Sequence, residues 1–349
     1  MSSRVVGLAF QLFLLFFLAR SDSPEPSAKR PMRPLRGRYT WPNTGWSAPV
    51  TPLHIVNQHP HDPAAFLQGL LYDPESDTFY ESTGLYGHSD LREVDIPSGT
   101  VKRKKLVDST LFAEGLTLFN ETTLIQLTWQ AKKALYYDKK TLELTGTVPY
   151  IGQGWGLTTA VNQSLLYFTD GSNQIRRVHP LTLEPILPPL TVHDADNNTI
   201  KDLNEIELIT FGNTTTEIWA NVWLQPVVLR IDPESGLVKS YLNLSDISTE
   251  QRKSDVNNVL NGVAFDPVRN RIWLSGKRWN TLIEIRVDGV NYDPANPNAS
   301  NDAAPPKDAG GGGGTADAPP VSDDGDGSMR TGVVVGLIVL GTLGVGLVA

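Results

Sequence analysis

Five residues with polar or aromatic side chains precede the same short motif, in which a Gly or Glu is followed by an aliphatic residue. They are Gln68, Glu114, Trp155, Asn204 and Asn261, and they recur at intervals of about 40 to 60 residues. A purely structural repeat would reuse one residue type, whereas this set holds one carboxylate, three amides and one indole. A carboxylate can transfer protons, and amides and indoles can hold a polar ligand. The five positions are therefore candidates for one site.

Aromatic and charged residues recur at two further positions of the same repeat. Phe66 and Phe112 stand two residues before Gln68 and Glu114. Four residues end the apolar runs that follow the motifs: Trp129, Asp170, Trp223 and Lys277. If equivalent positions meet in space, Glu114 and Lys277 lie beside an aromatic-lined cup that suits a small molecule or a peptide end. The structural alternatives are an ion pair that only ties two repeats together and rings that only pack between repeats.

The segment between residues 54 and 290 has the pattern of an all-β fold. Short alternating or β-branched runs bounded by Gly, Asn, Asp and Pro recur, and none shows a sustained three-four apolar spacing. Each repeat holds a motif strand, a second strand, and a further strand with a turn. Five units of roughly 40 to 50 residues are typical of a β-propeller, whose blades are four-stranded sheets around a channel. The sequence therefore predicts a five-bladed β-propeller.

The ends of this propeller must also be joined. Residues 53–58 form an apolar strand ahead of the first repeat, and we expect it to pair with the outer edge of the last blade, which leaves no open sheet edge. The longer intervals at the fourth and fifth repeats indicate insertions, which we place in polar loops near 194–199 and 248–257. Because innermost strands face the channel, the motif residues should form a ring at one of its mouths.

The composition excludes several kinds of protein. The chain has 349 residues, 40% of them hydrophobic, and no Cys, which rules out a disulfide-stapled miniprotein, a thiol enzyme and a Cys-ligated zinc site. Its six His residues are scattered without metal-ligand spacing. A formal net charge of -8, from 30 Lys and Arg against 38 Asp and Glu, provides no basic field for phosphates. No nucleic-acid partner is expected.

The two ends of the chain indicate the secretory pathway. Residues 1–21 combine an early Arg, an apolar run and small residues, which is typical of a signal peptide, with an uncleaved signal anchor as the alternative. Residues 331–349 form an uncharged apolar stretch that stops at the terminus, which matches a GPI-anchor signal, with a transmembrane helix as the alternative. We expect a protein of the cell surface or an endomembrane lumen, attached to the membrane by its C-terminal tail.

Two low-complexity segments flank the propeller, which we assign to residues 51–292. Residues 22–50 are a Pro-rich basic linker, and residues 293–330, almost all Asp, Asn, Ala, Pro and Gly, are a flexible stalk. Six Asn-X-Ser/Thr sequons fit a glycosylating compartment. The predicted glycosylation sites are Asn120, Asn162, Asn197, Asn213, Asn243 and Asn298.

Eight short segments occur in the order and with the spacing of one enzyme family. They span residues 66–70, 79–87, 112–117, 154–158, 203–207, 220–223, 259–262 and 275–279, and include FLQGL, FAEGLT, GWGLT and SGKRW. Together they look like the plant and bacterial type of glutaminyl-peptide cyclotransferase, and the resemblance covers about residues 55 to 288.

This resemblance implies a five-bladed propeller that converts the N-terminal Gln of a peptide or protein to pyroglutamate and releases ammonia. It implies a metal-independent acyltransferase, unrelated in fold to the zinc-dependent animal enzymes, and we expect a monomer. Three catalytic residues carry over: Glu114, Lys277 and Asn204. Six substrate-binding residues carry over: Phe66, Gln68, Phe112, Trp129, Trp155 and Trp223. The family usually has Gly before the catalytic Glu, where this chain has Ala113.

The residues themselves can account for this chemistry. Glu114, the only acid among the five motif residues, could accept a proton from the attacking α-amine and donate it to the departing ammonia. Lys277 and Asn204 could donate hydrogen bonds to the oxygen that becomes negative. Aromatic neighbours would desolvate Glu114 and raise its pKa. No cofactor is expected for the reaction, while a structural divalent cation in the channel is left open.

Two other functions fit part of the pattern. The first is a non-catalytic cell-surface propeller that binds peptide ends or glycans. The second is a calcium-assisted hydrolase or lactonase, which would need more channel carboxylates than Glu114, Asp170 and Glu205 provide.

Overall fold

The computed structural model describes residues 45–211, 215–252 and 255–291. These residues belong to the first of two compact units, Met1–Ala304, while the second unit, Pro305–Ala349, lies outside the described residues. The predicted signal peptide, stalk and hydrophobic tail also lie outside them, as do most of the linker and the sequons at Asn213 and Asn298. Within the described residues, no helix is long and apolar enough to cross a membrane.

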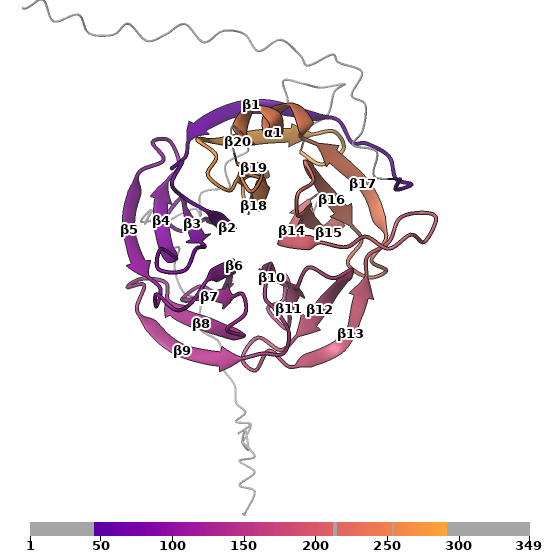
Figure 1. Ribbon diagram of the computed structural model, residues 1–349. Helices are drawn as coiled ribbons and strands as arrows, with labels where there is room; N and C mark the ends of the chain where they lie inside the picture. The colour runs from indigo at the N-terminus through magenta and orange to yellow at the C-terminus, as the bar shows by residue number, and fades with distance from the viewer. Residues whose placement is uncertain (1–44, 212–214, 253–254, 292–349) are drawn as a thin grey trace, which may run out of the picture. The chain divides into compact units, whose positions relative to one another are not determined.

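Five four-stranded antiparallel sheets form the blades of a propeller and surround a common centre, which confirms the predicted fold class (Figure 1). We call them blades A to E in the chain order of their innermost strands. Blades A to C run from the innermost strand outward as follows: blade A, β2 Leu67–Asp73, β3 Thr78–Thr83, β4 Asp90–Asp95 and β5 Val101–Leu106; blade B, β6 Ala113–Asn120, β7 Thr123–Thr128, β8 Lys133–Asp138 and β9 Leu144–Pro149; blade C, β10 Leu157–Thr159, β11 Leu166–Thr169, β12 Gln174–Val178 and β13 Pro185–Thr191.

The last two blades follow the same order from the inside outward. Blade D contains β14 Leu203–Phe211, β15 Thr215–Val222, β16 Val227–Ile231 and β17 Val238–Asn243, and blade E contains β18 Leu260–Asp266, β19 Arg271–Gly276, β20 Thr281–Val287 and β1 Leu53–Pro60. The N-terminal strand β1 is thus the outer strand of the last blade, as predicted, and it pairs antiparallel with β20.

Burial explains which sequences form which strands. The innermost strand β2 and its neighbour β3 are buried at every residue, since other strands cover both of their faces. The outer strand β5, Val101–Leu106, alternates half-buried and exposed residues and places Lys side chains on its exposed face. Charged side chains on an edge strand oppose pairing with another molecule. Five apolar clusters then fill the spaces between consecutive blades, including the space between blades E and A.

Glycines in the motifs let the innermost strands approach one another. A Cβ on Gly115 would lie 2.7 Å from both the backbone N of Leu157 and the backbone O of Trp155 in blade C. A Cβ on Gly69 would lie 2.6 Å from the backbone N of Leu116 in blade B. No side chain fits at such a distance, so Gly is required where two backbones meet.

One insertion differs from the expectation. Residues 248–257 were predicted to be a polar loop, but Ser245–Arg252 form the helix α1, which connects blade D to blade E. Asn243 starts this helix, because its Oδ1 accepts hydrogen bonds from the Ser245 backbone N at 3.0 Å and from the Ser245 hydroxyl at 2.7 Å. Buried Ile247 anchors the helix in the cluster between blades D and E. A helix with so little apolar surface leaves almost no periodic pattern in the sequence.

Candidate active site

The motif residues lie where the ladders of the innermost strands are interrupted. In blades A, B, D and E the register between the first and second strands shifts at the motif, for example between Ala113 and Leu116. Such bulges re-aim side chains and free backbone groups from the ladder. In blade B the freed groups bond to the neighbours: Gly115 N donates to Trp155 O at 2.7 Å, and Glu114 O accepts from the Ser82 hydroxyl at 2.5 Å.

The candidate site residues that follow the second strands lie at the same edge of each sheet. Trp129, Trp223 and Lys277 each come directly after a second strand ends. Their backbone N atoms donate to residues that precede the innermost strands: Trp129 to Phe112 at 2.9 Å, Trp223 to Asp202 at 2.8 Å and Lys277 to Val259 at 2.8 Å. Each pairing joins the start of an innermost strand to the end of the second strand, so these residues lie at one mouth of the channel.

Two oppositely charged side chains, Glu114 and Lys277, are buried and interact with each other. The exposed fractions of Glu114 and Lys277 are only 6% and 5%. Burial raises the pKa of Glu114 well above its usual value, and the positive charge of Lys277 partly opposes this shift. Burial also lowers the pKa of Lys277 to about 8, against the opposing effect of the Glu114 carboxylate. Each charge thus shifts the pKa of the other, although no ion pair joins the two groups among the described residues.

Aromatic rings from blades A and B stand beside Lys277. The Nζ atom of Lys277 lies 5.1 Å from the centroid of the Phe66 ring, in a cation–π arrangement. Phe66 meets Phe112 edge-to-face at 6.1 Å, and Phe112 meets Trp129 at 5.8 Å. Tyr86 also packs against Phe112, at 5.5 Å. The rings form a continuous wall that starts at the ammonium group.

Gln153 extends the wall to the opposite side. Its Oε1 accepts hydrogen bonds from the indole of Trp129 at 2.7 Å and from the indole of Trp155 at 3.2 Å. Trp155 in turn meets Trp223 edge-to-face at 5.9 Å. Trp223 is 37% exposed, which places it at the rim. The wall therefore passes from blade A through blades B and C to blade D, and Lys277 of blade E stands at its start.

Three amides, Gln68, Asn204 and Asn261, occupy the remaining motif positions. The Oε1 atom of Gln68 accepts a hydrogen bond of 3.4 Å from Asn261 Nδ2, which also donates to Leu67 O at 3.0 Å. Asn204 is buried, and its backbone O accepts from the Thr169 hydroxyl at 2.6 Å. Within the described residues no hydrogen bond connects the Asn204 side chain with Glu114 or Lys277.

Sequence reasoning missed some residues that shape the wall. Gln153 and Tyr86 belong to loops and share no repeat position with the motif residues. Arg176 holds the Gln153 loop, because its guanidinium donates to Ile151 O at 2.6 Å and to Gln153 O at 3.1 Å. Gly84 makes room for the wall, since a Cβ there would clash with the Phe112 ring. The sequence held a signal for both Gly84 and Tyr86, since both lie within the segment 79–87 of the family resemblance.

Other residues named from the sequence make contacts that support the fold. Asp170 faces Arg176 at 3.6 Å. Ala113 is fully buried, and its backbone N donates to the Ser89 hydroxyl at 3.1 Å. Glu205 accepts a 3.0 Å hydrogen bond from the backbone N of Val263, and burial raises its pKa well above the usual value.

The predicted glycosylation sites differ in accessibility. Asn162 and Asn197 are exposed, and Asn120 is half-buried. Asn243 is also half-buried, but its Nδ2, the atom that a glycan would occupy, is buried. In the described part of the chain, no group of three or more His, Asp or Glu side chains could hold a metal ion.

Comparisons with known proteins show which family and which proteins this chain resembles. The family described as "Glutamine cyclotransferase" matches residues 36–287. A protein of Arabidopsis thaliana named "Glutaminyl-peptide cyclotransferase" is 35% identical over 241 residues, which are 68% of this chain and 72% of that protein. A solved structure, "Crystal structure of Myxococcus xanthus Glutaminyl Cyclase", is similar with a TM-score of 0.61 and 29% identity, and the match covers 69% of this chain and 99% of that one.

Proposed function

The chain belongs to the glutamine cyclotransferase family, and we propose that it converts the N-terminal Gln of peptides and proteins to pyroglutamate with release of ammonia. The observation that carries this proposal is the pair of buried, interacting opposite charges, Glu114 and Lys277, next to a wall of aromatic rings. One group can move protons, the other can stabilise negative charge, and the wall can hold a single flat side chain against both.

Glu114 is the proposed general base and general acid. The α-amine nitrogen of the substrate attacks the carboxamide carbon of the same Gln residue, so that a C–N bond forms and closes a five-membered ring. Glu114 accepts the proton that the amine loses. It then donates this proton to the carboxamide nitrogen, whose bond to carbon breaks as ammonia leaves. Burial raises the pKa of Glu114 well above its usual value, which suits a group that must both take and give a proton.

Lys277 and Asn204 are the proposed donors to the developing oxyanion. The carboxamide oxygen becomes negative in the tetrahedral intermediate, and a positioned donor in a dry site stabilises it by about 3 kcal/mol. Lys277 lies in such a site, since it is almost fully buried. With the amine and the carboxamide in one substrate residue, the wall needs only to hold that residue in a folded conformation, which avoids the entropic cost of joining two molecules.

Replacement of the carboxyl group tests this function. We expect Glu114→Gln to reduce ammonia release from Gln-initiated peptides by at least about 10³-fold, because the amide neither takes nor gives the proton. Binding of the same peptides, measured by calorimetry, should persist. Glu184→Gln, which changes an exposed Glu in the turn between β12 and β13, serves as the matched control and should keep full activity.

The same assay separates an enzyme from a binding propeller. A non-catalytic protein that binds peptide ends would release no ammonia before or after the substitution. We further propose that the proton transfers by Glu114 need no metal ion, so that turnover should be equal with and without a chelator. A chelator-sensitive reaction would contradict this part of the proposal.

We propose that the protein acts as a monomer in the secretory pathway, held at a membrane by its C-terminal tail. The apolar residues 5–19 and 331–349 support this location. Phospholipase treatment of cells should release the protein if residues 331–349 are a GPI signal, and retention would favour a spanning helix.

A further inference from the structure

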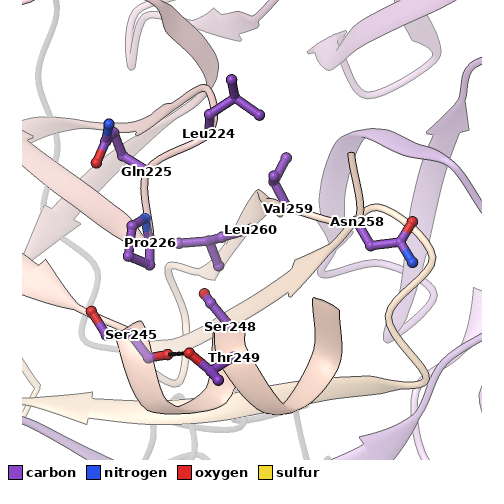
Figure 2. Close-up of a pocket in the computed structure, with 9 residues that line it drawn as sticks. All are labelled: Leu224, Gln225, Pro226, Ser245, Ser248, Thr249, Asn258, Val259 and Leu260. Carbon is purple, nitrogen blue, oxygen red and sulfur yellow. Dashed lines mark hydrogen bonds between the residues drawn. The ribbon is translucent and has the colours of Figure 1, made fainter. Parts of the chain in front are cut away.

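A pocket of about 170 Å³ lies between blades D and E (Figure 2). The turn after β15, with Leu224 and Pro226, forms one side, and Val259 and Leu260 at the start of β18 form the other. Helix α1 lines the pocket at the outer end, because it follows β17, the outermost strand of blade D. The pocket thus extends outward from the innermost strand of blade E toward the periphery.

Two residues that line this pocket are immediate neighbours of active-site residues. Leu224 follows Trp223, the rim residue of the aromatic wall, in the chain. On the other side, Val259 O accepts a hydrogen bond of 2.8 Å from the backbone N of Lys277. A substrate whose first residue lies over Lys277 therefore has this pocket as a neighbour for the residues that follow.

The lining of the pocket defines the chemistry that it accepts. Hydroxyl, amide and aliphatic side chains line it, and none of them is charged. The Ser248 hydroxyl, which Figure 2 shows directed from helix α1 toward the Val259–Leu260 segment, is buried and has no hydrogen-bond partner within the described residues. The volume far exceeds the roughly 10–15 Å³ that one water needs. A charged side chain would lose its hydration there without an ion partner, which disfavours it.

We propose that this pocket binds the side chain of the residue that follows the N-terminal Gln, and that it selects uncharged side chains. This inference rests on the proposed function, because it assigns the first substrate residue to the cup over Glu114 and Lys277. It makes Thr249 and Ser248 of helix α1 specificity-determining residues for the second position of the peptide.

A charge exchange at Thr249 tests the proposal in the full chain. Thr249 lines the pocket and is exposed, so the fold should accept a charge there. The measured quantity is kcat/KM for ammonia release from Gln-Lys-Gly divided by that from Gln-Glu-Gly. We expect Thr249→Asp to raise this ratio about fivefold and Thr249→Lys to lower it about fivefold, and high salt to reduce both effects. Glu250→Gln, an exposed residue of the same helix outside the pocket lining, should leave the ratio unchanged.

A second variant fills the pocket. Ser248→Phe should raise KM for Gln-Leu-Gly about tenfold but leave KM for glutaminamide, which has no second residue, unchanged. Glu250→Phe places the same ring on the helix outside the pocket lining and should alter neither, and equal melting temperatures would show that both variants fold. Ser248 is partly buried, so Ser248→Phe could fail to fold. In that case the two Thr249 variants test the pocket assignment on their own.

The outcomes separate this inference from the proposed function. Turnover of all peptides with an unchanged Lys-to-Glu ratio in both Thr249 variants overturns the pocket assignment and leaves the enzyme activity standing. The assignment is also overturned if the Thr249 variants change the preference between Lys and Glu only when these stand at the third residue of the peptide. Absence of ammonia release from every peptide overturns the proposed function and this inference together.

Discussion

At the scale of single residues, burial decides how Glu114 and Lys277 ionise. Each side chain would be fully charged at neutral pH in water, yet burial raises the pKa of Glu114 well above its usual range and lowers the pKa of Lys277 to about 8. The shifts bring two groups that normally titrate far apart toward the same pH range. Because the two charges interact, activity should report their combined titration.

The pH profile of kcat/KM follows from these directions. Activity should rise with pH as Glu114 and the substrate α-amine, whose pKa is about 7.7 to 8.0, lose their protons. It should fall above about pH 8 as Lys277 loses the proton that makes it a strong donor. Lys277→Arg keeps a positive charge that does not titrate in this range. The fall of activity at alkaline pH should therefore be absent in this variant, even if its kcat is lower. An alkaline limb at the same pH in this variant would exclude Lys277 as its source.

Gln153 tests the role of the aromatic wall. Its Oε1 holds two indoles, from Trp129 and Trp155, through one atom. Gln153→Leu removes this acceptor, and we expect KM for Gln-peptides to rise about tenfold while kcat changes less, because the wall positions the substrate and transfers no proton. Gln153→Glu keeps the acceptor and should retain a KM within about twofold of the wild type. An equal rise of KM in both variants would show that substrate binding does not depend on the shared acceptor.

At the scale of strands, the site depends on the contacts between innermost strands. The bulges at the motifs direct backbone groups toward the neighbouring blade, and the motif Gly residues allow the two backbones to meet. The motif in blade D departs from this pattern, because Glu205 takes the place of Gly and its carboxylate bonds across to Val263 of blade E.

Gly115→Ala should therefore destabilise the fold. The added methyl would lie 2.7 Å from backbone atoms of blade C, which cannot rotate away. Overpacking of this kind costs about 3 kcal/mol, seen as a lower midpoint in urea unfolding with an unchanged slope. Gly146→Ala, in the outer strand β9, is the matched control, since a Cβ there meets nothing within 4 Å. Similar stability of the two variants would contradict the importance of the interblade contact.

At the scale of the whole propeller, one strand closes the ring. Strand β1, Leu53–Pro60, pairs with β20, more than two hundred residues later in the chain. Leu53 and Ile55 also pack against the core between blades D and E. Without β1 the β20 edge would be open to solvent and to other molecules.

Removal of β1 should therefore prevent folding and abolish activity. A chain that begins at residue 61 should aggregate or remain unfolded by circular dichroism, whereas a chain that begins at residue 45 should fold and cyclise Gln-peptides. Both chains keep Glu114, Lys277 and the whole wall, so any difference between them comes from residues 45–60, which include β1 and the segment before it that packs on Tyr241 of blade D. Full activity of the shorter chain would show that β1 is dispensable.

Much of the fold could be predicted from the sequence, because the blades repeat and the repeat is visible as similar motifs at a regular spacing. The period of the motifs predicted five blades, and the position within each repeat brought Glu114, Trp155 and Lys277 to one mouth of the channel, since equivalent residues of a closed ring must converge. The terminal apolar strand similarly predicted the closure by β1.

Tertiary structure alone decided the features that no repeat contains. Gln153 bridges two indoles from a loop, and helix α1 forms one side of a pocket from within an insertion. The protonation of Glu114 and Lys277 likewise depends on how fully the surrounding blades bury them. These properties arise from contacts between residues far apart in the chain, and local pattern carries no information about such contacts until the blades are packed together.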